Sequence, residues 1–123
     1  MNWQDASLVL AGLLGGGTAL VHGVLIQRLV VRPFLATAPR TPPAIRRLMP
    51  LLVHFSTIAW LLGALALIAA AGWFGPQARL ATGLSVGCLY LMGALANLWG
   101  TRGRHPGWML MAAALGLIAV GVG

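Results

Sequence analysis

The chain has 123 residues, of which 59% are hydrophobic, and only nine carry a formal charge: eight arginines and one aspartate. A water-soluble domain has about a quarter charged residues, so this composition excludes a soluble globular protein. The stretches without Asp, Glu, Lys or Arg cover 6–27, 48–78, 80–101 and 105–123. Because a bilayer core takes about 20 apolar residues of helix, we expect a single transmembrane domain, 1–123, with four spans.

The first span is expected over about 7–31. Asp5 and Ser7 are favourable N-cap residues, and the helix should stop before Pro33 because the residue preceding a proline avoids helical backbone angles. The residues before the span are not basic, so we interpret the span as a retained helix rather than a secretion signal.

The other spans are expected over about 44–73, 79–100 and 106–122. Thr41, followed by two prolines, indicates an N-cap and a first turn, so the second helix should begin in the loop before the membrane. Pro50 lies inside this helix, where the missing hydrogen bond should produce a kink. Glycine and proline residues separate the later spans, and Pro106 fits the first turn of the last helix. The expected fold is an all-α integral membrane four-helix bundle.

The arginines gather on one side of the expected bundle. Seven lie in or beside the first and third connectors, whereas the second connector has only Arg79. Positive residues next to spans stay in the cytoplasm, so we expect both termini to lie outside. Short loops against a bilayer favour anionic lipid headgroups over nucleic acid as the partner. The arginines expected at headgroups are Arg28, Arg32, Arg46, Arg47, Arg102 and Arg104.

The most polar side chains within the spans are expected at one depth. Counted from the flanking arginines at 1.5 Å per residue, His22, His54 and Asn97 lie roughly 8 to 10 Å inside the cytoplasmic boundary. Thr18 and Thr57 each share a helix face with one of the histidines. Polar residues inside a membrane are costly and usually functional, so these five residues are candidates for binding a ligand.

Three interpretations of the two histidines stay open. Imidazole is the commonest ligand of transition metals and haem iron, so His22 and His54 would together hold a metal ion or a haem b. Softer ligands at a similar depth are Met92, Met109 and Met111. A neutral ring N–H also suits a quinone carbonyl, a lipid or another small ligand. Alternatively, the histidines hold the helices together through hydrogen bonds of about 0.6 kcal/mol each.

Small residues indicate where helices approach closely. Gly12, Gly16 and Gly23 fall on one face of the first span, and Gly83 and Gly87 form a Gly-x-x-x-Gly step in the third. These faces either pack within the bundle or form a homo-oligomer or a docking surface for a larger complex.

Several activities are disfavoured by missing residues. The spans contain no Asp or Glu, and the chain has no phosphate-binding glycine-lysine loop, Cys-x-x-Cys or His-Glu-x-x-His motif. Ser56 has His54 only two residues away, on a different helix face, so a serine nucleophile is not supported. We therefore expect a non-enzymatic oligomeric bundle or an accessory subunit of a larger membrane complex. The alternatives are a haem- or metal-binding electron-transfer subunit and a quinone- or lipid-binding protein.

Two runs of the sequence, 22–34 and 47–60, resemble a group of small bacterial four-span membrane proteins without assigned activity. Members of that group share a histidine at the end of the first span, an Arg-Pro exit and a second span of the form His-x-[ST]-[ST]-x-Ala-Trp. The loop 102–105 is similar too, so the resemblance covers most of the chain. It implies a multi-pass helical bundle of the bacterial inner membrane and no particular activity.

Overall fold

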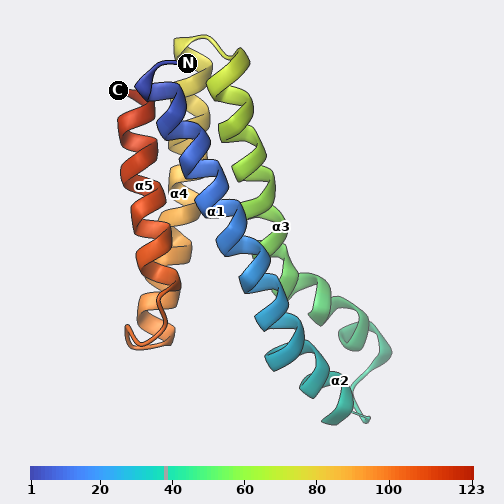
Figure 1. The fold of residues 1–123 in the computed structure, drawn as a ribbon. Coiled ribbons are helices and arrows are strands. Elements are labelled where there is room, and N and C mark those ends of the chain that lie inside the picture. The colour runs from blue at the N-terminus through green and yellow to red at the C-terminus, as the bar shows by residue number, and fades with distance from the viewer. Residues whose placement is uncertain (38) are drawn as a thin grey trace.

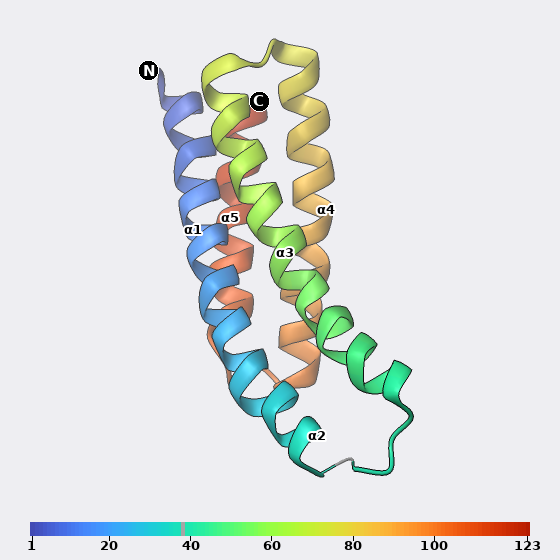
Figure 2. The same ribbon diagram turned by 90° about the vertical axis from the view of Figure 1, so that its right-hand side faces the viewer.

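The computed structural model describes residues 1–37 and 39–123, and every regular element in them is helical. Figures 1 and 2 show a helical bundle with both termini at one end. The expected all-α four-helix bundle is confirmed. In chain order the elements are α1 (Trp3–Ile26), a π-helical turn η1 (Gln27–Val31), α2 (Arg32–Thr37), α3 (Pro43–Trp73), α4 (Pro76–Gly100) and α5 (Gly107–Val122).

Three helical segments are long and apolar enough to cross a bilayer: Trp3–Thr37, Pro43–Trp73 and Pro76–Gly100. Large apolar side chains cover their outer surfaces, and Leu62 and Leu84 are each 61% exposed. Such a surface fits lipid rather than water. Helix α5 has only 16 residues, which span about 24 Å, so a complete fourth crossing stays a prediction.

The N-terminal cap of α1 differs from the prediction of Asp5 or Ser7. Asn2 is the N-cap, because its side chain accepts a hydrogen bond from the Asp5 N–H at 2.8 Å. The Asp5 carboxylate accepts in return from the Asn2 N–H at 3.2 Å. These two bonds form a capping box, which satisfies two of the free N–H groups at the helix start.

The prediction that the first helix stops before Pro33 is wrong. Residues Trp3–Thr37 form one continuous helical segment. The chain passes through η1, where the Arg32 N–H bonds to the Gln27 carbonyl five residues back. This wider turn makes room for the proline ring, and Pro33 then falls in the first turn of α2, where a missing N–H is least costly. Likewise α3 is capped by Pro42 rather than Thr41, and it continues through Pro50.

The bundle is tight at the end that holds the termini and opens toward the other end. In Figure 1 the lower parts of α1 and α3 lean together away from the α4–α5 hairpin. The long hairpin formed by α1, α2 and α3 therefore separates from the shorter α4–α5 hairpin on the side of the arginine-bearing loops.

The glycine faces lie against other helices of the same chain. A Cβ at Gly12 would approach the Ala64 carbonyl oxygen to 2.7 Å, and one at Gly23 would approach Thr57 Cγ2 to 2.8 Å, so both glycines pack α1 on α3. Gly83 faces Val122, and Gly87 faces Leu115, which packs α4 on α5. These small residues serve close packing inside the bundle.

One ion pair closes the end of the bundle that holds the termini. Arg79 Nη2 lies 2.7 Å from Asp5 Oδ1, and the same nitrogen donates to the Ala71 carbonyl at 3.0 Å. Asp5 is the only acidic side chain in the sequence. The seven other arginines at the opposite end therefore have no carboxylate side chain of this chain to pair with.

Candidate ligand-binding site

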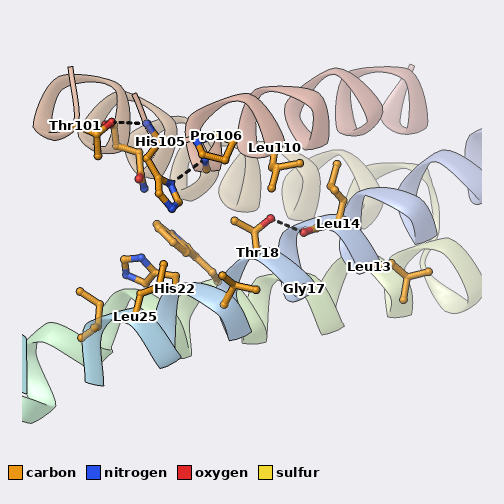
Figure 3. A pocket seen from close by; sticks show the side chains of 15 residues that line it. Leu13, Leu14, Gly17, Thr18, His22, Leu25, Thr101, His105, Pro106 and Leu110 are labelled. Atoms are coloured by element: carbon orange, nitrogen blue, oxygen red, sulfur yellow. Dashed lines mark hydrogen bonds between the residues drawn. The ribbon is translucent and has the colours of Figure 1, made fainter. Parts of the chain in front are cut away.

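A cavity of about 630 Å³ lies where α1 and the α4–α5 hairpin diverge. Figure 3 shows it between α1 on one side and the loop before α5 on the other. Its apolar lining includes Leu13, Leu14, Val21, Leu25, Ile26 and Leu110, and its polar lining is Thr18, His22, Asn97, Thr101 and His105. Among the described residues that line it, none is an arginine or a carboxylate. The cavity is therefore amphipathic and carries no fixed charge.

The loop that brings His105 to the cavity is held by a tight helix end. Arg102 and Gly103 follow α4 with φ angles of 51° and 75°. The Gly103 N–H donates to the Leu98 carbonyl at 2.9 Å, and the Arg102 N–H donates to the Trp99 carbonyl at 3.3 Å. This pair of bonds is a Schellman motif, which turns the chain sharply back toward α5.

His105 lines the cavity with one ring nitrogen fixed. Its Nδ1 accepts a hydrogen bond from the Gly107 N–H at 3.1 Å, so the ring proton lies on Nε2. Its backbone N–H donates to Thr101 Oγ1 at 3.4 Å, which anchors the residue to the end of α4. Figure 3 shows the ring reaching into the space across from His22. His105 thus offers one N–H donor to the cavity.

His22 lies on the opposite wall and is held by α3. Its Nε2 is 3.2 Å from Ser56 Oγ, and its ring packs on Trp60 with the centroids 4.7 Å apart. The Ser56 hydroxyl donates to the Val53 carbonyl at 3.5 Å. The direction of the bond between His22 and Ser56 depends on the tautomer of His22, and in either tautomer Nε2 is engaged with Ser56.

His54 belongs to a different pocket. Its Nε2 lies 2.9 Å from Gln27 Oε1, and it lines a groove of about 460 Å³ between α1–η1 and α3. The structure therefore places His22 and His54 in separate pockets, with the Nε2 of each held by its own partner. In the described part of the chain, no group of three or more His, Cys, Asp or Glu side chains gathers around a point where a metal ion would fit.

The remaining candidates fall in three places. Asn97 and Thr18 line the cavity, although the Thr18 hydroxyl already donates to the Leu14 carbonyl at 2.8 Å. Thr57 lines the groove with His54. The methionines line neither space, because Met111 is fully buried in the core and the other two face outward: Met92 and Met109.

The arginines divide between the two loops at the open end of the bundle. Arg28 and Arg32 line the groove with His54. Arg46 and Arg47 lie in the first turns of α3, and Arg102 and Arg104 lie in the α4–α5 loop.

Comparison with known protein families, with curated proteins and with solved structures found no match to this chain. The cavity and the groove are therefore the basis for assigning a function.

Two residues that matter in these pockets were not singled out as site residues from the sequence. His105 follows two loop arginines in the sequence, and it lies at the cavity because the chain turns sharply at Arg102 and Gly103. Gln27 is the hydrogen-bond partner of His54. Its only signal in the sequence is its polar side chain, one helical turn after Gly23 on the face of α1 that packs against α3.

Proposed function

We propose that this protein is a small bacterial inner-membrane binding protein, and that its cavity holds a lipid-soluble ligand with an apolar tail and an uncharged head that carries oxygen atoms. A quinone is a ligand of this class. The observation that supports the proposal most is the lining of the cavity, which combines leucines with two histidines and no fixed charge. Its volume of about 630 Å³ falls within the roughly 300 to 1,000 Å³ of small-molecule sites.

The hydrogen-bonding groups suit the head of such a ligand. The Nε2–H of His105 donates to a carbonyl oxygen, and Nδ1 of His22 accepts from a hydroxyl group or donates to a second carbonyl, according to its tautomer. The pair therefore matches both a quinone carbonyl and a quinol hydroxyl. A phosphate head would find no counter-charge there, and an uncompensated charge is costly to bury.

The ligand has a route from the bilayer. Leu13 and Val21, which line the cavity on α1, are 60% and 58% exposed, and Leu110 on α5 is 40% exposed. The cavity thus opens sideways onto surface that faces lipid. In the proposed orientation, with both termini outside, the ligand lies in the cytoplasmic half of the membrane, next to the arginine-bearing loops.

The other functions considered from the sequence have less support. A metal or haem held jointly by His22 and His54 requires both rings in one pocket, whereas each lines its own and bonds its own partner. A homo-oligomer or a larger complex would form through the leucine-covered outer faces, because the glycine faces are occupied within the bundle.

Blocking the cavity tests the proposal. Gly17 lines the cavity, and a Cβ there would meet nothing within 4 Å, so Gly17→Leu places a side chain in the cavity without disturbing the helices. We expect this variant to bind a short-chain ubiquinone about tenfold more weakly or worse, measured in detergent by quenching of tryptophan fluorescence. His105→Ala removes one hydrogen bond and should weaken binding about three- to tenfold.

The matched control is Gly116→Leu, which also introduces leucine into open space but lies on α5 outside the cavity. It should bind the quinone as the wild type does. Equal affinity of the wild type and Gly17→Leu would contradict the proposal. A Soret absorption band that His22→Ala abolishes would identify haem as the occupant instead.

A further inference from the structure

The groove on the other side of α1 contains a buried hydroxyl without a partner. Thr57 is 8% exposed, and its Oγ1 is buried without a hydrogen-bond partner among the described residues. The hydroxyls of Thr18, Thr37 and Thr82 each donate to the carbonyl four residues back. The equivalent carbonyl for Thr57 belongs to Val53, which accepts instead from Ser56.

An unpaired buried hydroxyl costs about 1 to 3 kcal/mol, so its retention indicates a hydrogen-bond partner supplied from outside the chain. Thr57 lines the groove of about 460 Å³, but its Oγ1 is covered, so the Thr57 side chain must rotate about its Cα–Cβ bond before the hydroxyl can bond a ligand there.

Two arginines give the groove a strong positive charge. Arg28 and Arg32 line it one helical turn apart, on η1 and at the start of α2. The single acidic residue, Asp5, is paired with Arg79 at the far end of the bundle. No carboxylate side chain of this chain can neutralise the groove, so the counter-ion must come from outside.

The amide of Gln27 adds a third kind of donor. Its Oε1 is held by His54 at 2.9 Å, which leaves the NH2 group as a donor at the same groove. Two guanidinium groups, an amide and a hydroxyl together match the oxygen atoms of a phosphate group.

The upper wall of the groove is apolar and open to lipid. Leu20 and Val24 lie on α1 above the arginines and are 60% and 52% exposed. An acyl chain therefore has a surface to lie on, directly beside the cationic end. We propose that this groove binds an anionic phospholipid, with its phosphate at Arg28, Arg32 and Thr57 and an acyl chain along Leu20 and Val24.

Native mass spectrometry of the purified protein, titrated with phosphatidylglycerol or with phosphatidylcholine of the same chains, tests the proposal. The wild type should prefer phosphatidylglycerol by about tenfold or more. Arg28→Gln/Arg32→Gln should abolish the preference. Arg102→Gln/Arg104→Gln removes the same charge from the neighbouring loop and should keep it. Loss of the preference in both double variants would show general attraction between charges and overturn the assignment.

Thr57→Val separates ligand binding from a structural role. Valine keeps the shape and removes the hydroxyl, so phosphatidylglycerol should bind about three- to tenfold more weakly. Without lipid, the variant should be at least as stable as the wild type, because an unpaired buried hydroxyl is gone. A less stable lipid-free variant would show an internal partner for the hydroxyl and overturn the proposal.

Two further measurements identify the source of the phosphate and the site. Inorganic phosphate should not displace the lipid at equal concentration, because it lacks the acyl chain that lies on Leu20 and Val24. Displacement by phosphate would assign the groove to a soluble anion and overturn the lipid assignment. Gly17→Leu should leave the lipid preference unchanged, since it fills the separate cavity. This independence distinguishes failure here from failure of the quinone proposal.

Discussion

Three glycines on α1 should respond differently to the same substitution by alanine. A Cβ at Gly12 would lie 2.7 Å from the Ala64 carbonyl oxygen and 2.8 Å from Ile68 Cγ1. At Gly16 the only close atom is Ala64 Cβ at 3.2 Å, and at Gly17 nothing lies within 4 Å. In a helix interior alanine is more favourable than glycine by about 1 kcal/mol, and this gain is common to all three sites. Differences among the variants therefore measure packing alone.

The contact at Gly12 involves the backbone, so it cannot be relieved by rotating a side chain. The added methyl group must push α1 away from α3, and overpacking of this kind costs about 1 to 3 kcal/mol. We expect Gly17→Ala to be slightly more stable than the wild type. Gly12→Ala should be less stable than Gly17→Ala by about 1 to 3 kcal/mol, with Gly16→Ala between them.

The assay is unfolding of the purified protein in mixed micelles by a rising fraction of SDS, followed by tryptophan fluorescence. Trp60 is buried between the helices and reports their separation. The midpoint, expressed as the fraction of SDS, should be lowest for Gly12→Ala, intermediate for Gly16→Ala and highest for Gly17→Ala. Equal midpoints for Gly12→Ala and Gly17→Ala would refute the close packing of α1 on α3 described here.

Two further predictions concern the ends of the bundle. The first uses cysteine labelling in a protein whose native thiol has been removed by Cys88→Ser. A cysteine at Thr41 should react only from the cytoplasmic side and one at Gln77 only from outside, because seven of the eight arginines lie at the Thr41 end. Labelling of Thr41 from outside would reverse the proposed orientation. Arg79→Gln should lower the SDS midpoint, since it removes the ion pair with Asp5, and an unchanged midpoint would show that the pair adds nothing to stability.

The sequence predicts the fold well because the lengths of uncharged stretches are a direct physical constraint. Helix ends are harder to predict, because they depend on competing local options. Asn2 and Asp5 are both good caps, and only the reciprocal bonds of the capping box decide between them. Pro33 indicates a helix end, but a π-helical turn lets the chain continue, and that turn has no clear signature in the sequence.

The candidate site could be predicted only in part. Polarity within an apolar span draws attention to His22 and Asn97, and the structure places both in the lining of the cavity. However, the depth of a residue along a helix does not determine the face of the helix on which it lies. His22 and His54 lie at similar depth but line different pockets on α1. His105 was missed because its position depends on how the chain turns after α4, which is a property of tertiary structure.

The ion pair between Asp5 and Arg79 has a consequence for a cell with an energised membrane. It pairs the only charged side chains at one end of the bundle, whereas the other end carries seven arginines and no acidic side chain. Moving one positive charge against the membrane potential requires about 2.3 kcal/mol per 100 mV. Turning the bundle over would thus require about 16 kcal/mol per 100 mV if all seven charges crossed the full potential. The electric field that respiration maintains would then hold this small protein in a single orientation.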